Sequence, residues 1–331
     1  PPNRTSYFSG EQFSTAGMVV TAYYTDGSSG AVTGYTYSPA GALAAGNTTI
    51  TVSYTEGGVT KTTTQAITVT TINTTLNSNS WATIKAVSDA GKGDSYWDVG
   101  DTKTITINGT VQGFTFSNLS IAVFILGFNH NSNREGSSRI HFQIGKISNK
   151  LVGLCDNSYG SYVSSGFCMN TSRTNSGGWN GSYMRKTVLG NSGTPSSPPA
   201  NPLLAALPAD LRAVMKSVTK YSDNTGGGSD NAGYVTATTD YLFLLAEFEY
   251  HGSRSYANSA EQNYQKQYDY YKAGNSKVHY RHDSTGTAVT AWTRSAYSGS
   301  GNAFCLVNTD GTPNNNADNS RALAPGFYRM G

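Results

Sequence analysis

The chain has 331 residues, carries a formal net charge of +3, and has charged side chains at 13% of its positions. Lysine and arginine are scattered and the net charge is small, which argues against a nucleic-acid-binding surface. No apolar run approaches the roughly 20 residues that a membrane-spanning helix needs, so we expect no membrane insertion. The counts of glycine (37) and tyrosine (22) are high, as is typical of β-rich extracellular or virion proteins.

Residues 1–72 alternate apolar and polar side chains in short runs, the pattern of a small antiparallel sandwich. Asp26-Gly27 and Glu56-Gly57-Gly58 are hairpin signals between such runs. The Thr- and Asn-rich residues 73–80 have the composition of a linker. Three tyrosines of the first segment are expected to pack on its sheets: Tyr23, Tyr24 and Tyr54.

A second domain is predicted over residues 81–331, and its length suits one further core. Strands dominate it, and Ile121–Leu126 is a buried one. One helix is predicted to restart at Pro208 and to run to Met215, and another from Ser259 to Lys272 with packed tyrosines. The predicted fold class is mainly β with some α. The first residues show no signal-peptide pattern, which leaves the route of export open.

The three cysteines, Cys155, Cys168 and Cys305, do not form the dense, even set of a disulfide-stapled domain. Free buried thiols are the more common state of such residues, and a pairing of Cys155 with Cys168 is the alternative.

The tail from Trp292 onwards alternates apolar positions with runs of turn-forming polar residues. We expect the apolar positions to be buried anchors and the runs between them to be exposed loops. The anchors are Trp292, Phe304, Val307, Leu323 and Phe327.

The motifs W-x-R-S from Trp292, F-x-x-V-x-x-x-G from Phe304 and A-P-G-F from Ala324 resemble a domain family of unknown biochemical function from gut bacteria and their prophages. That family is similar to C-type-lectin-fold variable proteins of diversity-generating retroelements. Gly177-Gly-Trp179 and the stretch from Glu247 to Gly252 fit the same pattern. The spacing from Gly10 to Gly27 and the V-S-Y-T-E-G-G stretch from Val52 resemble bacterial immunoglobulin-like domains of surface adhesins.

The resemblance implies an immunoglobulin-like β-sandwich spacer followed by a C-type-lectin-like α+β domain whose segment 292–329 is displayed and rewritten. Scaffold positions would be Trp179, Arg185, Trp292, Arg294, Phe304 and Phe327. The variable, ligand-binding positions would be Tyr297, Ser298, Ser300, Asn302, Leu306, Asn308, Asp310, Thr312, Asn314, Asn315, Asn316, Asp318 and Asn319.

Motifs of common enzymes do not occur in the sequence. It has neither G-x-S-x-G nor H-E-x-x-H, and Gly226–Gly228 lacks the Lys-Ser/Thr of a phosphate loop. His279 and His282 are a weak metal signal. We therefore predict no catalytic residues, no bound metal, no cofactor and no enzyme activity.

Two alternatives concern acidic and amide residues. Asp310, Asn314, Asp318 and Asn319 offer oxygen ligands, so Ca²⁺ stays possible, although the E-P-N and W-N-D triplets of sugar-binding C-type lectins do not occur and a solvated loop is preferred.

Glu247 and Glu249, two apart on a predicted strand, would face the same side. We expect them to form structural ion pairs with Arg185 or Arg294. The alternative is a carboxylate pair of a cell-wall-active enzyme.

The resemblance thus implies a phage- or prophage-encoded receptor-binding or adhesin protein that is located on the virion or cell surface. Its loops would bind a bacterial surface ligand, either protein or glycan. Tyrosine, serine, glycine and asparagine give contact area and adaptable hydrogen bonds at low entropic cost. The alternative is a structural virion, fibre or decoration subunit that forms homo-oligomers or attaches to a phage tail structure.

Overall fold

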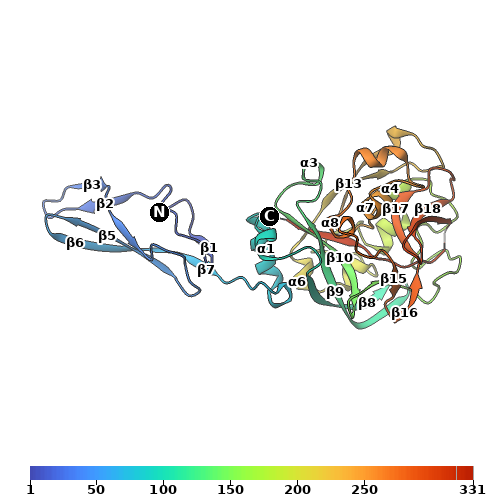
Figure 1. Ribbon diagram of the computed structural model, residues 1–331, viewed down its shortest axis with the longest axis horizontal. Helices are drawn as coiled ribbons and strands as arrows, with labels where there is room; N and C mark the ends of the chain where they lie inside the picture. Colours follow the sequence, from blue (N-terminus) through green and yellow to red (C-terminus); the bar gives the residue numbers. More distant parts are fainter. Residues whose placement is uncertain (318, 331) are drawn as a thin grey trace. The chain divides into compact units, whose positions relative to one another are not determined.

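The computed structural model describes residues 1–317 and 319–330, and it divides into two compact units, Pro1–Thr74 and Thr75–Gly331 (Figure 1). Strands hold 39% of the residues and helices 17%, so the predicted fold class, mainly β with some α, is confirmed. No helix in the described ranges is long and apolar enough to cross a membrane.

The first unit is built from short strands around one small core. A parallel pair joins β1 to β7, a hairpin joins β2 to β3, and a three-stranded sheet has the order β4-β5-β6. The buried core consists of Tyr7, Phe13, Leu43, Ile50, Val52 and Ile67. The strands are β1 (Ser6–Phe8), β2 (Val20–Tyr23), β3 (Ser29–Val32), β4 (Thr36–Ser38), β5 (Thr49–Glu56), β6 (Val59–Ala66) and β7 (Thr68–Thr70).

Both predicted hairpin turns form. Gly57 and Gly58 connect β5 to β6 with φ of 54° and 81°, the left-handed pair that a two-residue hairpin loop requires. In the other turn the carboxylate of Asp26 accepts a hydrogen bond from the Ser28 N–H at 2.9 Å. Glycine and aspartate at these positions therefore set the strand register of the first unit.

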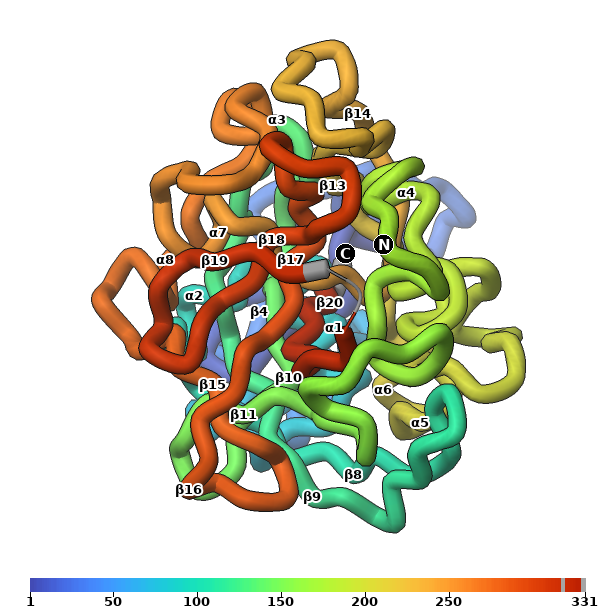
Figure 2. Tube along the Cα trace, turned by 90° about the vertical axis from the view of Figure 1, so that its right-hand side faces the viewer, coloured from blue at the N-terminus to red at the C-terminus, as the bar shows by residue number. Residues whose placement is uncertain are grey.

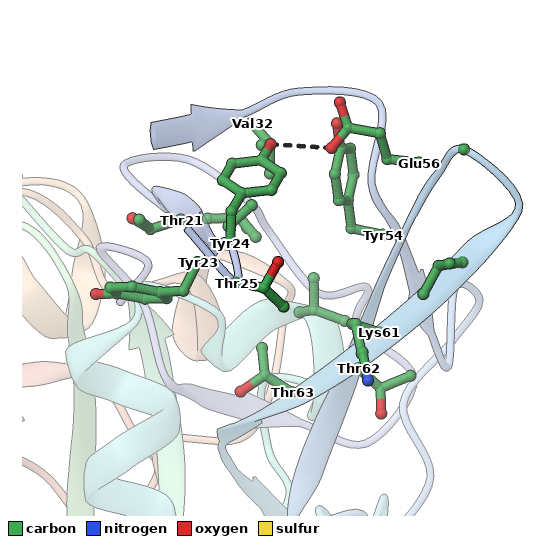
Figure 3. A pocket seen from close by; sticks show the side chains of 15 residues that line it. Thr21, Tyr23, Tyr24, Thr25, Val32, Tyr54, Glu56, Lys61, Thr62 and Thr63 are labelled. Carbon is green, nitrogen blue, oxygen red and sulfur yellow. Dashed lines mark hydrogen bonds between the residues drawn. The ribbon is translucent and has the colours of Figure 1, made fainter. Parts of the chain in front are cut away.

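The predicted packing of Tyr23 and Tyr24 is wrong, because their side chains are 82% and 43% exposed. Strand β2 turns Val20 and Ala22 inward, and Tyr23 lies on the opposite face. Tyr24 donates a hydrogen bond to Glu56 at 2.9 Å, and Tyr54 is half-buried beside it (Figure 3). These side chains line an open groove of about 780 Å³ on the first unit.

The second unit begins inside the segment predicted as a linker, and that prediction is wrong from Thr75 onwards. Leu76 is buried, and the ammonium group of Lys103 donates to the Asn79 carbonyl at 2.6 Å. The hydroxyl of Ser80 accepts from the Thr83 N–H and caps helix α1 (Trp81–Asp89). An apolar side chain and a helix cap hold these residues against the unit.

Strand β10 lies inside the larger sheet of the second unit, between β9 and β20 (Figure 1). Helix α1 places Trp81 against Phe142 and Phe327, with ring centroids 5.6 and 6.2 Å away. The strands of this sheet are β8 (Thr102–Val111), β9 (Phe114–Phe128), β10 (Arg139–Ile147), β11 (Lys150–Gly153), β12 (Met215–Lys216), β15 (His279–Arg281), β16 (Ser284–Val289) and β20 (Gly326–Met330).

Two smaller sheets complete the second unit: the hairpin β13 (Val218–Asp223) with β14 (Val235–Asp240), and the sheet β17 (Ala291–Ala296), β18 (Ala303–Val307) and β19 (Pro313–Ala317). The short helical segments are η1 (Leu76–Ser78), α2 (Gly93–Tyr96), α3 (Ser132–Glu135), α4 (Gly178–Gly181), η2 (Met184–Val188), α5 (Leu203–Ala206), α6 (Ala209–Arg212), η3 (Ala232–Tyr234), α7 (Glu247–His251), η4 (Ser259–Asn263) and α8 (Asp269–Lys272).

Both predicted helices are shorter than expected. Pro208 precedes α6, which ends at Arg212 because Met215 already pairs with β20. The stretch from Ser259 to Lys272 is split into η4 and α8. Tyr268, which precedes α8, has extended backbone and a fully buried ring. The Tyr268 ring is thus buried from extended backbone between two short helices, and not from the continuous helix that the tyrosine spacing predicts.

We expect Ile50→Ala to lower the free energy of unfolding of the first unit by about 2–5 kcal/mol, because a fully buried side chain leaves a cavity. All four tryptophans lie in the second unit. Thermal unfolding followed by tryptophan fluorescence should therefore not change, whereas the first unit's transition in circular dichroism should move to lower temperature. Val59→Ala, at a 59% exposed position, is the control. If Ile50→Ala also shifted the fluorescence transition, the two units would not unfold independently of each other.

Candidate ligand-binding surface on the C-terminal sheet

The apolar positions of the tail are buried, as predicted. Trp292, Phe304, Val307, Leu323 and Phe327 are each at most 1% exposed. The indole N–H of Trp292 donates to the Phe167 carbonyl at 3.1 Å. Figure 2 shows the tail, in red, crossing the face turned toward the viewer, with β17, β18 and β19 side by side. These anchors fix the sheet from which the predicted binding loops extend.

The buried side chain of Asn175 contacts the loop between β17 and β18 at several points. Its amide nitrogen lies 3.1, 2.9 and 2.8 Å from the carbonyl oxygens of Tyr297, Ser300 and Ala303. Its backbone N–H donates to the Gly301 carbonyl at 2.8 Å. All these contacts reach main-chain atoms of the loop. Within residues 297–302, the Ser298 hydroxyl adds side-chain support through hydrogen bonds to the carbonyls of Tyr256 and Ala257.

Four predicted binding residues lie on this loop. The Tyr297 ring packs edge-on against Tyr256, with centroids 5.6 Å apart. The Ser298 hydroxyl contacts Arg254 at 3.3 Å and is part of the loop's support. Asn302 is exposed and accepts a hydrogen bond from the Ser300 hydroxyl at 2.6 Å.

A second group of predicted residues forms the turn between β18 and β19. The carboxylate of Asp310 accepts from the N–H and the hydroxyl of Thr312, and both residues are exposed. Asn308 closes the turn through a 2.8 Å backbone hydrogen bond to Thr312. Strand β18, with 5 residues, separates this turn from the loop 297–302 by about 17 Å at roughly 3.3 Å per residue. The predicted residues therefore form two loops at opposite ends of β18, not one tip.

The remaining predicted residues follow the edge of the sheet. Asn314, Asn315 and Asn316 belong to β19, which pairs with β18, and are half-buried. Asn319 donates to the Gly160 carbonyl at 2.8 Å. Asp318 lies outside the described residues. Leu306 was predicted to be displayed, and this is wrong: it is 2% exposed because β18 is buried along its whole length.

The oxygen ligands proposed for Ca²⁺ are spread along the tail. Asp310 precedes β19 and Asn319 follows it, so the two lie beyond opposite ends of this strand. One oxygen of Asp310 is used within its own turn. The side-chain Oδ1 of Asn314 accepts from the Asn315 N–H at 2.8 Å. Among the described candidates, Asp310 and Asn314 thus each use an oxygen within the tail itself.

Glu247 and Glu249 lie on helix α7, so the predicted strand is wrong. The helix begins with these acidic residues in its first turn, where Glu249 accepts from the Ala246 N–H, and Gly252 ends it in left-handed conformation. Residues two apart on a helix point roughly 200° apart around its axis. The two carboxylates therefore serve different neighbours.

Glu247 supports the loop 297–302 indirectly, through the segment 255–257. Its carboxylate accepts hydrogen bonds from the N–H groups of Ser255, Tyr256 and Ala257 at 2.8–3.1 Å. Ala257 in turn pairs with Tyr297 through the backbone. A fully buried carboxylate with three donors is a structural cap. A carboxylate pair acting on a cell-wall polymer is not formed by these residues.

Glu249 forms the predicted ion pair with Arg294. The guanidinium group binds both carboxylate oxygens, at 2.5 and 2.8 Å, and all of these atoms are buried. Burial by itself would raise the pKa of Glu249, but Arg294 and Lys220 outweigh it and hold that pKa well below its usual range. Arg185 pairs instead with Asp240, at 2.6 Å, which also accepts from the indole N–H of Trp179.

Lys220 lies at the centre of a buried charge cluster. Its ammonium group is 2.8 Å from Glu135, 3.1 Å from Glu249 and 2.8 Å from the hydroxyl of Tyr268. His130, Glu135 and Glu249 are close enough to hold a metal ion. The Lys220 ammonium group contacts both carboxylates, so they have a positive charge beside them without a metal ion.

The two histidines considered as a metal pair have separate partners. His279 is buried and lies 3.4 Å from the hydroxyl of Tyr250, and burial lowers its pKa to about 3. The His282 ring accepts a hydrogen bond from the Cys155 N–H at 3.1 Å. Cys155, Cys168 and Cys305 are free and buried, so the predicted thiol state is confirmed and the disulfide alternative is wrong.

The model of a family described as a domain of unknown function (DUF6273) matches residues 162–328. The chain belongs to this family. No curated protein and no solved structure matches it. The DUF6273 match contains the predicted scaffold positions, both loops of the tail and the edge strand β19.

Three structural residues of the DUF6273 region were missed from the sequence: Asn175, Lys220 and Asp240. Lys220 shares a face of β13 with Val218 and Ser222, and this face is buried. The sequence did carry a signal for Lys220: it lies two residues after Val218, so on a strand it shares the face of an apolar residue and is expected to be buried. Asn175 precedes Gly177-Gly178, but nothing in its local pattern indicates a contact with residues 297–303.

We expect Arg294→Met to lower the free energy of unfolding by about 3–5 kcal/mol, because it leaves Glu249 buried with one cation fewer. Arg281→Met is the matched control, since it removes an ion pair with Asp283, whose side chain is 47% exposed, and should cost less than about 1 kcal/mol. Urea unfolding of both variants measures the difference. Equal losses of unfolding free energy in the two variants would show that the buried ion pair stabilises the fold no more than the exposed one does.

Glu261 gives the fold a pH dependence that Glu261→Gln should remove. Burial raises its pKa to about 7 from 4.5, against hydrogen bonds from Ser295, Gln265 and the Asp223 N–H. The folded state then binds a proton that the unfolded chain has released, so stability should fall as pH rises from about 4.5 to about 7.

Urea unfolding across this pH range measures the effect. The free energies of the original chain and of Glu261→Gln should diverge by up to about 3 kcal/mol, the value of 2.5 pKa units. Parallel curves for the two proteins would mean that Glu261 titrates at its ordinary pKa in the fold.

Proposed function

We propose that the DUF6273 region is the ligand-binding part of a phage- or prophage-encoded receptor-binding or adhesin protein that contacts a bacterial surface protein or glycan. The first unit would act as its spacer. The binding surface would be formed by the loop 297–302, the turn 308–312 and the edge strand β19. On this proposal the protein acts at a virion or cell surface and uses no catalytic residues.

The observation that carries the proposal is how the loop 297–302 is held. Asn175 binds main-chain oxygens of the loop, and Glu247 binds main-chain N–H groups of the segment 255–257 beneath it. Exposed side chains on such a loop, unlike the bonded hydroxyl of Ser298, can change with little effect on its backbone. A segment with changing ligand specificity, as the resemblance to retroelement variable proteins implies, needs this separation between support and display.

The chemistry of the displayed positions supports the same function. Asn302, Asp310 and Thr312 are exposed, and Tyr297 and Asn308 are half-buried. Asparagine, threonine and tyrosine can form hydrogen bonds and contact area with many partners at low entropic cost, as in antibody loops. Buried anchors behind them keep the surface ordered before binding, which reduces the entropy that binding loses.

A combined variant with alanine at Tyr297, Asn302, Asn308 and Asn314 tests the proposal. We expect binding of the labelled protein to host bacteria to weaken by at least about 30-fold, the effect of losing one hot-spot side chain of about 2 kcal/mol. The melting temperature should change little, because the loop backbone is held by Asn175. Tyr23→Ala, at an 82% exposed position outside the region, is the control.

Unchanged binding by the folded variant would exclude the tail as the contact surface. A structural virion or fibre subunit is the second candidate, because β19 is the edge strand of its sheet and an edge can pair with another chain. Light scattering of the same variant separates the two functions. A structural subunit would form regular oligomers that the substitutions disrupt, whereas a receptor-binding protein would keep its oligomeric state and lose only host binding.

A further inference from the structure

Exposed large apolar side chains are concentrated on the first unit. Among the described residues they are Val19, Tyr23, Tyr24, Val59 and Tyr162, and of these only Tyr162 belongs to the second unit. Tyr23, Tyr24 and Val59 border the groove of about 780 Å³ on the first unit, a volume within the roughly 300–1,000 Å³ of ligand sites. Apolar side chains that gather at one exposed place mark an interaction site.

The groove lies between two hairpins that belong to different sheets. Strand β2 pairs only with β3, the β5–β6 hairpin belongs to the sheet β4-β5-β6, and within residues 1–74 no strand pairing joins the two hairpins. Val20 and Ala22 of β2 are half-buried, and Val52 of β5 is part of the buried core. These three side chains line the groove (Figure 3). The apolar floor of the groove is therefore continuous with the core of the unit.

The strand register shows which side chains of β6 face the groove. Val52 pairs with Thr63, and Tyr54 pairs with Lys61. Paired residues of antiparallel strands share a face, so Lys61 and Thr63 lie on the groove side of β6 and Thr64 lies on the opposite side. Lys61 and Thr63 are exposed, Tyr54 is half-buried, and all three line the groove. A ligand in the groove can therefore reach these side chains.

Tyr24 is held at the rim of the groove by a hydrogen bond. Its hydroxyl donates to the Glu56 carboxylate at 2.9 Å, and its side chain remains 43% exposed. Tyr54 lines the groove beside this pair (Figure 3). The Tyr24 ring is thus fixed before a ligand arrives, which reduces the entropy that binding loses.

The chemistry of the lining narrows the ligand. Its charged side chains, Glu56 and Lys61, have opposite signs, so the groove favours neither anions nor cations. Hydroxyl groups supply many of its other polar atoms, from Tyr24, Thr25, Tyr54, Thr62 and Thr63. A hydroxyl both donates and accepts, and apolar side chains of a protein partner would leave these groups without hydrogen bonds. Sugar rings offer hydroxyls for the threonines and C–H faces for the tyrosine rings.

We propose that this groove binds a neutral glycan. The C–H faces of its sugar rings pack on Tyr24 and Tyr54, and its hydroxyls bond to Thr63 and the neighbouring hydroxyl groups. The first unit then contributes a binding site of its own besides acting as a spacer. None of the tail residues lines the groove, so this proposal does not depend on the function proposed for the tail.

Saturation-transfer NMR on the full chain tests the proposal. The probes are four neutral tetrasaccharides: cellotetraose, maltotetraose, mannotetraose and chitotetraose. We expect transfer to at least one of them. Tyr24→Ala removes a ring face at an exposed position and should weaken this binding about tenfold, the effect of about 1.4 kcal/mol. Tyr162→Ala, at a 54% exposed tyrosine of the second unit, is the matched control and should bind as the original chain does.

Thr63→Trp fills the groove from an exposed position of β6 and should abolish transfer, whereas Thr64→Trp, on the opposite side of the same strand, should not. Absence of transfer to every probe, or equal transfer in these two variants, would overturn the proposal. It would also be overturned if light scattering showed that Thr63→Trp alone dissociates an oligomer, because the occupant would then be a second copy of the chain. The tail variant should keep glycan binding in the groove, so failure of either proposal is seen separately.

Discussion

The pairing of Arg294 with Glu249 is the contact on which the second unit depends. Arg294 also donates to Ser222 and to the Leu244 carbonyl, and Glu249 shares its charge with Lys220. Lys220 also binds Glu135, so four separate elements, β17, α7, β13 and α3, are tied through buried charges. Such charges are costly to remove from water, and the cost is offset only when every partner is in place. The geometry of these elements is therefore tightly specified.

This cluster positions the candidate binding surface. Arg294 lies on β17, and the loop 297–302 leaves that strand directly after Ala296. Glu247, two residues before Glu249 on α7, supports the neighbouring segment 255–257. Asn175 then closes the loop from the other side through main-chain contacts. Buried polar groups thus define the backbone, and the outward side chains of the loop remain available for a partner.

The sequence predicted features that depend on near neighbours. Gly57-Gly58 and Asp26-Gly27 form hairpins because their backbone preferences act within a few residues, and the tail anchors are buried because apolar positions separated by polar runs leave few alternatives. Predictions failed where distant contacts decided the outcome. Glu249 is helical because its carboxylate caps α7 and binds Arg294, and the Ser259–Lys272 helix is broken where the Tyr268 ring is buried against Lys220.

By itself the sequence determined the mainly β class, the hairpin turns and the anchors of the tail, since these follow from patterning. For Glu247 and Glu249 it predicted Arg185 or Arg294 as partners, and the structure pairs Glu249 with Arg294 and Arg185 with Asp240. Only the tertiary structure decided that the candidate residues lie at two ends of β18, that Leu306 is buried, and that Asn175 holds the loop 297–302. Those facts depend on contacts between residues more than a hundred positions apart or on strand pairing, which no local pattern encodes.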